Sequence, residues 1–427
     1  MPVLAVLAAG AAWWGLSIDG DPEPHRVVQE RRAPASGGMT LQPVDGGRRY
    51  FERWTGRARA GRRYFPIGVW LEAVDSPGAV AIDKGAGLNT YVGLTANSTL
   101  STIRVSGMKV LLQQDEWRSR ASSVGRETMG WGLLDEIDMS AENLRAGRAA
   151  LRSVVRQLPD DGRLRYNNFG KGVAFWLDDA DAAGYVNGVD VASADVYWFT
   201  DGSVCGQGEG GAEPGVVTRN GCHVAANYGW TVKRLRALVR PKGSKPVWAF
   251  VEVGHPFTEA AWPAITPAQV RAAVWHSLIA GARGVIYFNH SFGGPCLTQH
   301  ALREACYSAI RSTVTATNRR ISRLAAVLNA PFVTSGWSHG RSTRAMVKWS
   351  GGHFYLFAAS AAAATTTASF TLRCVGDATA KVLGERRSIR VTAGAFRDRF
   401  ANADSVHIYR IDGGRTCKLR ARARGAR

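Results

Sequence analysis

Two glutamates stand in apolar surroundings, where a carboxylate is costly to bury unless it is paired or used. The apolar run 129–134 ends on Asp135 and Glu136, and Glu252 lies within the apolar run 246–254. A pair of facing carboxyl groups can hydrolyse a glycosidic bond. One, with a raised pKa, protonates the leaving oxygen, and the other, ionised, attacks the anomeric carbon. The sequence therefore nominates Glu136 and Glu252 as the catalytic residues.

Eight short apolar runs, alternating with helix-like segments, would position these glutamates. Such alternation is typical of βα units around a parallel sheet, and eight units predict a (β/α)8 TIM barrel. A doubly wound open sheet is the alternative, but no glycine-rich first turn marks one. The strand ends at one mouth of a barrel carry its active site, so residues of the fourth and seventh runs face each other there. The eight runs are 65–71, 89–94, 108–114, 129–135, 163–169, 191–199, 246–253 and 283–289.

The composition and the hydropathy pattern of the chain differ on both sides of the predicted barrel, which spans 63–330. Short β-like runs separated by Gly, Asp and Asn predict a small C-terminal antiparallel β-sandwich over 331–413. The chain is apolar over 2–16, and segment 1–19 is interpreted as a signal peptide or membrane anchor. A basic lead-in rich in Pro, Gly and Arg is expected over 20–62, and a basic tail over 414–427.

The order of strands, the two strand-terminal glutamates and the C-terminal sandwich together resemble the clan A glycoside hydrolases. The resemblance covers residues 64 to about 412. It implies retention of anomeric configuration, with Glu136 as acid/base and Glu252 as nucleophile. Clan members usually place Asn before the acid/base, where this chain has Asp135, and a Trp on strand eight, where it has Phe288 and Asn289.

Other residues near predicted strand ends are candidates to line the pocket. Asp135 could contact substrate or orient Glu136. Tyr197 and Trp198 could bond the nucleophile and stack on a sugar, although core packing explains them as well. For each of the other candidates, a purely structural role explains the residue as well as substrate binding does. The remaining substrate-binding candidates are Trp70, Glu72, Gln114, Asp115, Asn167, His255 and Asn289.

Two motifs that suggest other chemistry lack the context that this chemistry needs. The glycine-rich segment 206–211 is not followed at once by a helix, and the G-x-S-x-G pattern around Ser338 leads into β-like sequence, which argues against an acyl hydrolase. The nine histidines include no H-E-x-x-H pair. We therefore expect no cofactor and no catalytic metal.

Six cysteines without a C-x-x-C pair favour disulfides and an oxidising compartment. Pairing of neighbours along the chain is the preferred arrangement, with buried free thiols as the alternative. The protein is thus expected to be secreted, or anchored to the membrane or cell wall outside the cell through its N-terminal segment. The preferred pairs are 205–222, 296–306 and 374–417.

The formal net charge of +20 comes from 54 Lys and Arg against 34 Asp and Glu. Segments 48–63 and 415–427 each carry +6, either as solubilising ends or for adhesion to an anionic surface. No nucleic-acid-binding motif accompanies them, so specific nucleic-acid binding is not expected. The predicted partner is a carbohydrate, and the basic segments favour an anionic glycan. The alternative to an enzyme is a non-catalytic carbohydrate-binding barrel for cell-wall adhesion.

Overall fold

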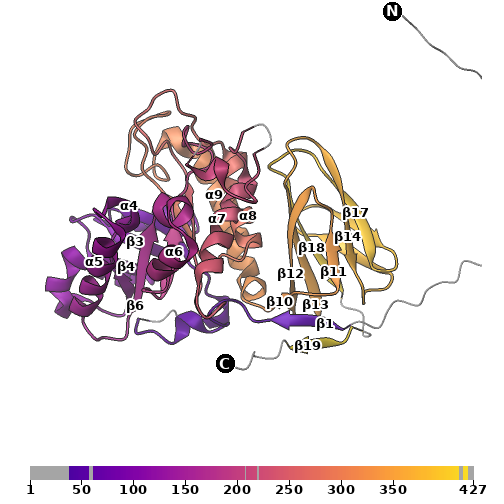
Figure 1. Ribbon diagram of the computed structural model, residues 1–427, viewed down its shortest axis with the longest axis horizontal. Helices are drawn as coiled ribbons and strands as arrows, with labels where there is room; N and C mark the ends of the chain where they lie inside the picture. Colours follow the sequence, from indigo (N-terminus) through magenta and orange to yellow (C-terminus); the bar gives the residue numbers. More distant parts are fainter. Residues whose placement is uncertain (1–37, 57–60, 207, 219–220, 413–416, 422–427) are drawn as a thin grey trace, which may run out of the picture. The chain divides into compact units, whose positions relative to one another are not determined.

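The computed structural model describes residues 38–56, 61–206, 208–218, 221–412 and 417–421, and the expected signal peptide or anchor lies outside them. The larger part of the described chain forms the predicted barrel (Figure 1). Eight parallel strands pair in the order β7-β6-β5-β4-β3-β2-β9-β8, and a bridge between Ala192 and Val247 closes the ring. The strands are β2 (Ile67–Glu72), β3 (Thr90–Leu94), β4 (Lys109–Gln113), β5 (Thr128–Gly132), β6 (Leu164–Phe169), β7 (Val191–Ala194), β8 (Ala249–Glu252) and β9 (Val285–Phe288).

Helices follow the strands and cover the outside of the barrel. Helix α8 begins with a reciprocal capping box between Thr266 at the N-cap and Gln269 at N3, with Pro267 at the first helical position, as the sequence Thr-Pro-Ala-Gln indicates. Between β4 and β5 only the short α3 and a 3-10 turn are present. The helices are α1 (Pro77–Gly85), α2 (Leu100–Ser106), α3 (Gln114–Trp117), α4 (Ile137–Ser140), α5 (Leu144–Gln157), α6 (Asp179–Val186), α7 (Ala225–Leu238), α8 (Pro267–Ile279) and α9 (Ser308–Leu328).

The segment expected to be a lead-in is partly built into the fold. Tyr50 and Phe51, in a 3-10 turn, are buried against Tyr64 and Trp248 in the apolar cluster inside the barrel. Upstream of them, β1 (Met39–Gln42) pairs with strands of the C-terminal sheet. Burial of large aromatic rings is strongly stabilising, and this explains why Tyr50 and Phe51 are held against the barrel although arginines flank them.

The C-terminal region is a two-sheet sandwich (Figure 1). A large sheet has the order β16-β15-β18-β13-β12-β10-β1-β19, and a three-stranded sheet has the order β11-β14-β17. Rings from both sheets meet in one core, for example Phe370 with Tyr409 at 5.7 Å. The strands are β10 (Phe332–Val333), β11 (Trp337–His339), β12 (Thr343–Ser350), β13 (His353–Ser360), β14 (Thr366–Leu372), β15 (Ala378–Val382), β16 (Arg387–Val391), β17 (Ala395–Phe400), β18 (Val406–Asp412) and β19 (Leu419–Ala421).

Two features of the sandwich differ from the sequence prediction. Residues 345–358 look like one β-like run in the sequence, but they form a hairpin of β12 and β13. Gly351 and Gly352 at its turn both adopt positive φ, as a tight two-residue turn requires. Part of the expected basic tail, β19, pairs in parallel with β1.

The three predicted disulfide pairs, Cys205–Cys222, Cys296–Cys306 and Cys374–Cys417, are confirmed. Among the described residues, no helix is long and apolar enough to span a membrane.

Candidate active site

Glu136 follows the fourth barrel strand on a backbone that few residues adopt. Its φ of 47° and ψ of 35° lie in the left-handed region, and its N–H donates to the Asn168 carbonyl at 3.1 Å. A non-glycine residue in this region costs about 1–2 kcal/mol, so the surrounding structure must enforce it. This turn sets the direction of the half-buried side chain at the C-terminal end of the barrel.

Three carboxyl groups, of Asp135, Glu136 and Asp195, gather around the side chain of Asn168. The Asn168 Nδ2 donates to Asp135 Oδ1 at 3.1 Å and to Asp195 Oδ1 at 2.9 Å. The Asp195 side chain is also hydrogen-bonded to that of Glu136, and its Oδ2 accepts from the Tyr197 hydroxyl at 3.1 Å. The strand-four glutamate is thus one member of a connected carboxyl cluster.

Burial and like charge keep protons in this cluster. Burial, followed by the Asp135 charge, raises the pKa of Glu136 to about 7. Burial and the charges of Glu136 and Asp135 raise the pKa of Asp195 well above its usual range. Near neutral pH, Glu136 is therefore close to its midpoint, which suits proton transfer in either direction.

Glu252 ends the seventh barrel strand and is fully buried, with 0% exposure. Its Oε1 accepts from the Tyr228 hydroxyl at 2.5 Å and from Thr200 Oγ1 at 3.1 Å, whereas Oε2 has no hydrogen-bond partner among the described residues. Burial raises its pKa to about 7, although the hydrogen bonds from Tyr228 and Thr200 act in the opposite direction. A buried carboxylate oxygen without a partner is unusual and marks this group as a functional candidate.

The Tyr197 hydroxyl is affected electrostatically by both glutamates. This hydroxyl is buried, and after burial the charges of Asp195, Glu136 and Glu252 raise its pKa. Both glutamates therefore lie within electrostatic reach of one hydroxyl group. The Tyr197 ring contacts the rings of Phe288 at 5.3 Å and Phe257 at 5.8 Å.

Partly exposed aromatic rings adjoin this group. Trp70 lies on β2 and contacts Phe250 at 5.4 Å, and Phe250 in turn contacts Phe288. Trp70, Phe257 and Phe288 are each only partly buried. Such rings offer the apolar faces on which sugar rings pack.

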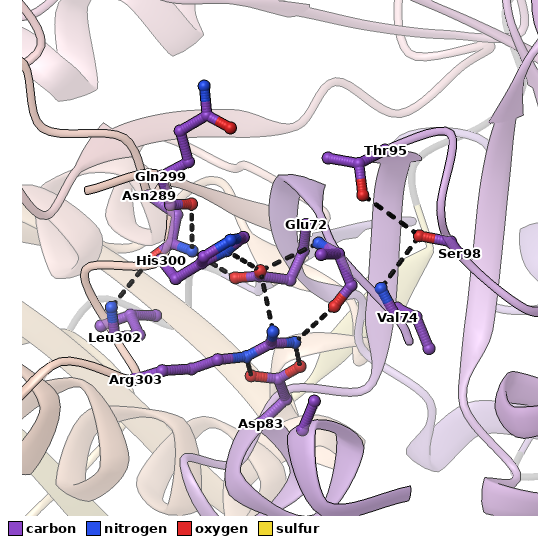
Figure 2. Close-up of polar contacts among 12 residues, drawn as sticks. Glu72, Val74, Asp83, Thr95, Ser98, Asn289, Gln299, His300, Leu302 and Arg303 are labelled. Atoms are coloured by element: carbon purple, nitrogen blue, oxygen red, sulfur yellow. Dashed lines mark hydrogen bonds and ion pairs between the residues drawn. The ribbon is translucent and has the colours of Figure 1, made fainter. Parts of the chain in front are cut away.

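Glu72 and Asn289, two predicted pocket residues, are instead joined in a buried polar network (Figure 2). The Glu72 carboxylate accepts from Asn289 and His300 and pairs with Arg303 Nη1 at 3.2 Å. Arg303 also pairs with Asp83 at 2.6 Å. Burial raises the pKa of Glu72, against the opposing effects of His300 and Arg303. The network ties strand ends β2 and β9 to the loop before α9 and to α1.

Several other residues singled out in the sequence make contacts outside the carboxyl cluster. Gln114 is buried at the start of α3, and Asp115 is exposed on the same helix. Trp198 is fully buried and donates to a threonine of α7. Both ring nitrogens of His255 lie within hydrogen-bond distance of backbone carbonyls two and seven residues further on. Ser338 is exposed on β11, outside the barrel.

Of the two asparagines of β6, the sequence analysis named Asn167 as a pocket candidate, and its neighbour Asn168 contacts the carboxyl cluster. Asn167 accepts from the Leu134 N–H at 2.7 Å, whereas Asn168 reaches the carboxyl groups. A usable signal was present, because Leu164 and Tyr166 face the barrel interior and strand alternation then puts position 168 inside. Asp195, Thr200 and Tyr228 were also missed.

The described residues contain no group of three or more His, Cys, Asp or Glu side chains that could hold a metal ion.

The fold resembles that of solved glycoside hydrolases. A structure described as a glycoside hydrolase has a TM-score of 0.51 at 11% identity, over 89% of this chain and 97% of that one. A glycoside hydrolase of family 5 from Bacteroides vulgatus has a TM-score of 0.52 at 12% identity, over 88% and 94%. Amy13B from Eubacterium rectale reaches 0.50 at 10% identity, over 86% and 99%. No family model and no curated protein matches the sequence. The resemblance to clan A enzymes is thus confirmed for the fold.

Proposed function

We propose that this chain is a glycoside hydrolase in which Glu136 is the acid/base and Glu252 is the nucleophile. The observation that carries the proposal is that both strand-terminal glutamates act on the same Tyr197 hydroxyl. Glycoside hydrolysis needs two carboxyl groups at one mouth of the barrel, one that carries a proton and one that is ionised, and a pKa of about 7 gives each glutamate access to both forms near neutral pH. The shared fold is consistent with this chemistry but does not by itself establish it.

Glu136 begins the reaction as an acid. Its pKa of about 7 leaves a proton available for the leaving oxygen at neutral pH. The hydrogen bond between the side chains of Asp195 and Glu136 lowers the pKa of Glu136 and so favours the carboxylate that remains. In the second step Glu136 takes a proton from the water that releases the sugar.

Glu252 attacks in its ionised form. The hydrogen bonds from Tyr228 and Thr200 favour that form and occupy Oε1, which leaves Oε2 for the anomeric carbon. Because the carboxylate has 0% exposure, its attack requires a rotation of the side chain or a shift of the segment above it. The product would be a glycosyl-enzyme, so the reaction would retain anomeric configuration.

Full burial of Glu252 is also the observation that favours a second candidate, a non-catalytic carbohydrate-binding barrel. In that case Trp70, Phe257 and Phe288 would still offer aromatic faces, but no bond would be cleaved. The three disulfides support secretion for either candidate.

Separate Glu136→Ala and Glu252→Ala variants test the proposal, assayed on aryl glycosides with good leaving groups. Each should lose at least about a hundredfold in kcat, and added azide should restore turnover by replacing the missing carboxylate. Glu127→Gln is the matched control, because Glu127 is a buried glutamate just before the opposite end of β5. Binding without turnover in the unaltered protein would favour the adhesion module. Full activity in either alanine variant would reject the assignment.

A further inference from the structure

A pocket of about 700 Å³ lies away from the carboxyl cluster, between helices α7 and α8 and the β11–β12 part of the sandwich. Trp230 and Lys233 of α7 line it, with His339 and Arg344 from the sandwich. Neither Glu136 nor Glu252 is among its lining residues. The volume falls within the ~300–1,000 Å³ typical of small-molecule sites.

The pocket carries positive charge that no acidic side chain neutralises. Lys233 and Arg344 form no ion pair with any described residue. Burial lowers the pKa of Lys233, and the charges of Arg344 and Arg236 lower it further. Two cations held near each other, without a counter-ion, attract an anionic ligand.

The two carboxylates in the lining do not alter this balance. Asp179 is paired with Arg234. Glu213 also lines the pocket and forms no ion pair with Lys233 or Arg344. With Arg234, the lining holds three cationic side chains and two carboxylates, so its formal charge is +1.

His339 adds a hydrogen-bond acceptor. Its Nδ1 lies 2.9 Å from the Gly340 carbonyl, which can only accept, so Nδ1 carries the hydrogen. Burial and the charges of Arg344 and Lys233 lower the pKa of His339, so the ring is neutral at pH 7. Its Nε2 then has a lone pair for a hydroxyl group.

Trp230 supplies an apolar face in the same pocket. Its ring is partly buried, and its Nε1 is fixed by the Pro214 carbonyl at 3.0 Å. An indole held in one orientation suits packing against the C–H face of a sugar.

We propose that this pocket is a second, non-catalytic site for an acidic saccharide. A sugar carboxylate would bind Lys233 and Arg344, a hydroxyl would donate to His339, and the ring would pack on Trp230. The net charge of +20 favours such a ligand over a neutral one. The saccharide part of the assignment rests on the proposed function, whereas the anion site stands on its own residues.

Calorimetric titration with a galacturonate trimer tests the site. The double variant Lys233→Met/Arg344→Met should bind about tenfold more weakly or worse, because it loses both charge-assisted contacts. The matched control is Lys381→Met/Arg390→Met, which removes the same charge from exposed positions of β15 and β16. Its affinity should be unchanged, and circular dichroism should show that both variants are folded.

Three results would overturn the proposal: equal affinity in the Lys233/Arg344 variant, equal affinity for a neutral galactose trimer, or inorganic sulfate binding as tightly as the galacturonate. The last would leave only a simple anion site. A Glu136→Gln/Glu252→Gln variant should keep the affinity of the unaltered protein. Retained binding there would support the second site even if glycosidase activity is never found, so the two proposals fail separately.

Discussion

Replacement of Glu252 by glutamine should stabilise the protein at alkaline pH relative to acidic pH while it abolishes turnover. The carboxyl group is fully buried, and burial raises its pKa from an ordinary 4.5 to about 7. Below pH 4.5 the group is protonated in both the folded and unfolded states and contributes nothing. Between pH 4.5 and 7 the folded state binds more protons than the unfolded state, so the free energy of unfolding falls as pH rises.

The size of this effect follows from the two pKa values. At 1.36 kcal/mol per pH unit, the difference between 4.5 and about 7 corresponds to about 3 kcal/mol of lost stability above pH 7. Glutamine has no charge to desolvate and escapes this loss. Its amide hydrogens beside Tyr228 and Thr200 add a cost, but that cost does not change with pH.

Chemical denaturation at pH 5 and pH 8 measures the effect. The stability of Glu252→Gln relative to the unaltered protein should rise by about 3 kcal/mol between these values. Glu127→Gln is the control. Although burial opposes it, pairing with Arg104 lowers the pKa of Glu127 below 4.5. The stability that this glutamate provides is therefore lost only at more acidic pH, and its variant should show almost no change between pH 5 and pH 8. A pH-independent difference for Glu252→Gln would refute the reasoning.

Three further predictions follow from the same contacts. Asn168→Ala should lower kcat about tenfold or more without unfolding the barrel, because it removes the amide that positions Asp135 and Asp195; unchanged kcat in a steady-state assay would contradict this. Arg303→Met should lower the free energy of unfolding by about 3–5 kcal/mol, because Glu72 and Asp83 lose their buried partner; a denaturation midpoint equal to that of the unaltered protein would count against it. The kcat/KM of the unaltered protein should fall above about pH 7 as Glu136 loses its proton, and a profile flat to pH 9 would exclude Glu136 as the acid.

The barrel was predictable because its signals are local. Each of the eight apolar runs overlaps one barrel strand, and helix α8 has the cap that its sequence indicates. Strand ends in a barrel converge by geometry, so Glu136 and Glu252 could be placed at one mouth without knowledge of any contact.

The contacts that define the site depend on tertiary packing and left little local trace. Tyr228 lies on an amphipathic helix, where its spacing indicates core packing, yet its hydroxyl reaches Glu252. Glu72 resembles a pocket residue at a strand end, but its partner Arg303 is more than two hundred residues away. The pairing of β1 with β19 likewise joins two short segments from opposite ends of the described chain.

The most direct test of the account is release of reducing ends from a panel of polysaccharides, compared between the unaltered protein and Glu252→Gln. The account predicts release from at least one polysaccharide by the unaltered protein and none by the variant. Equal release by both proteins, or binding to a polysaccharide with no release by either, would contradict the catalytic pair.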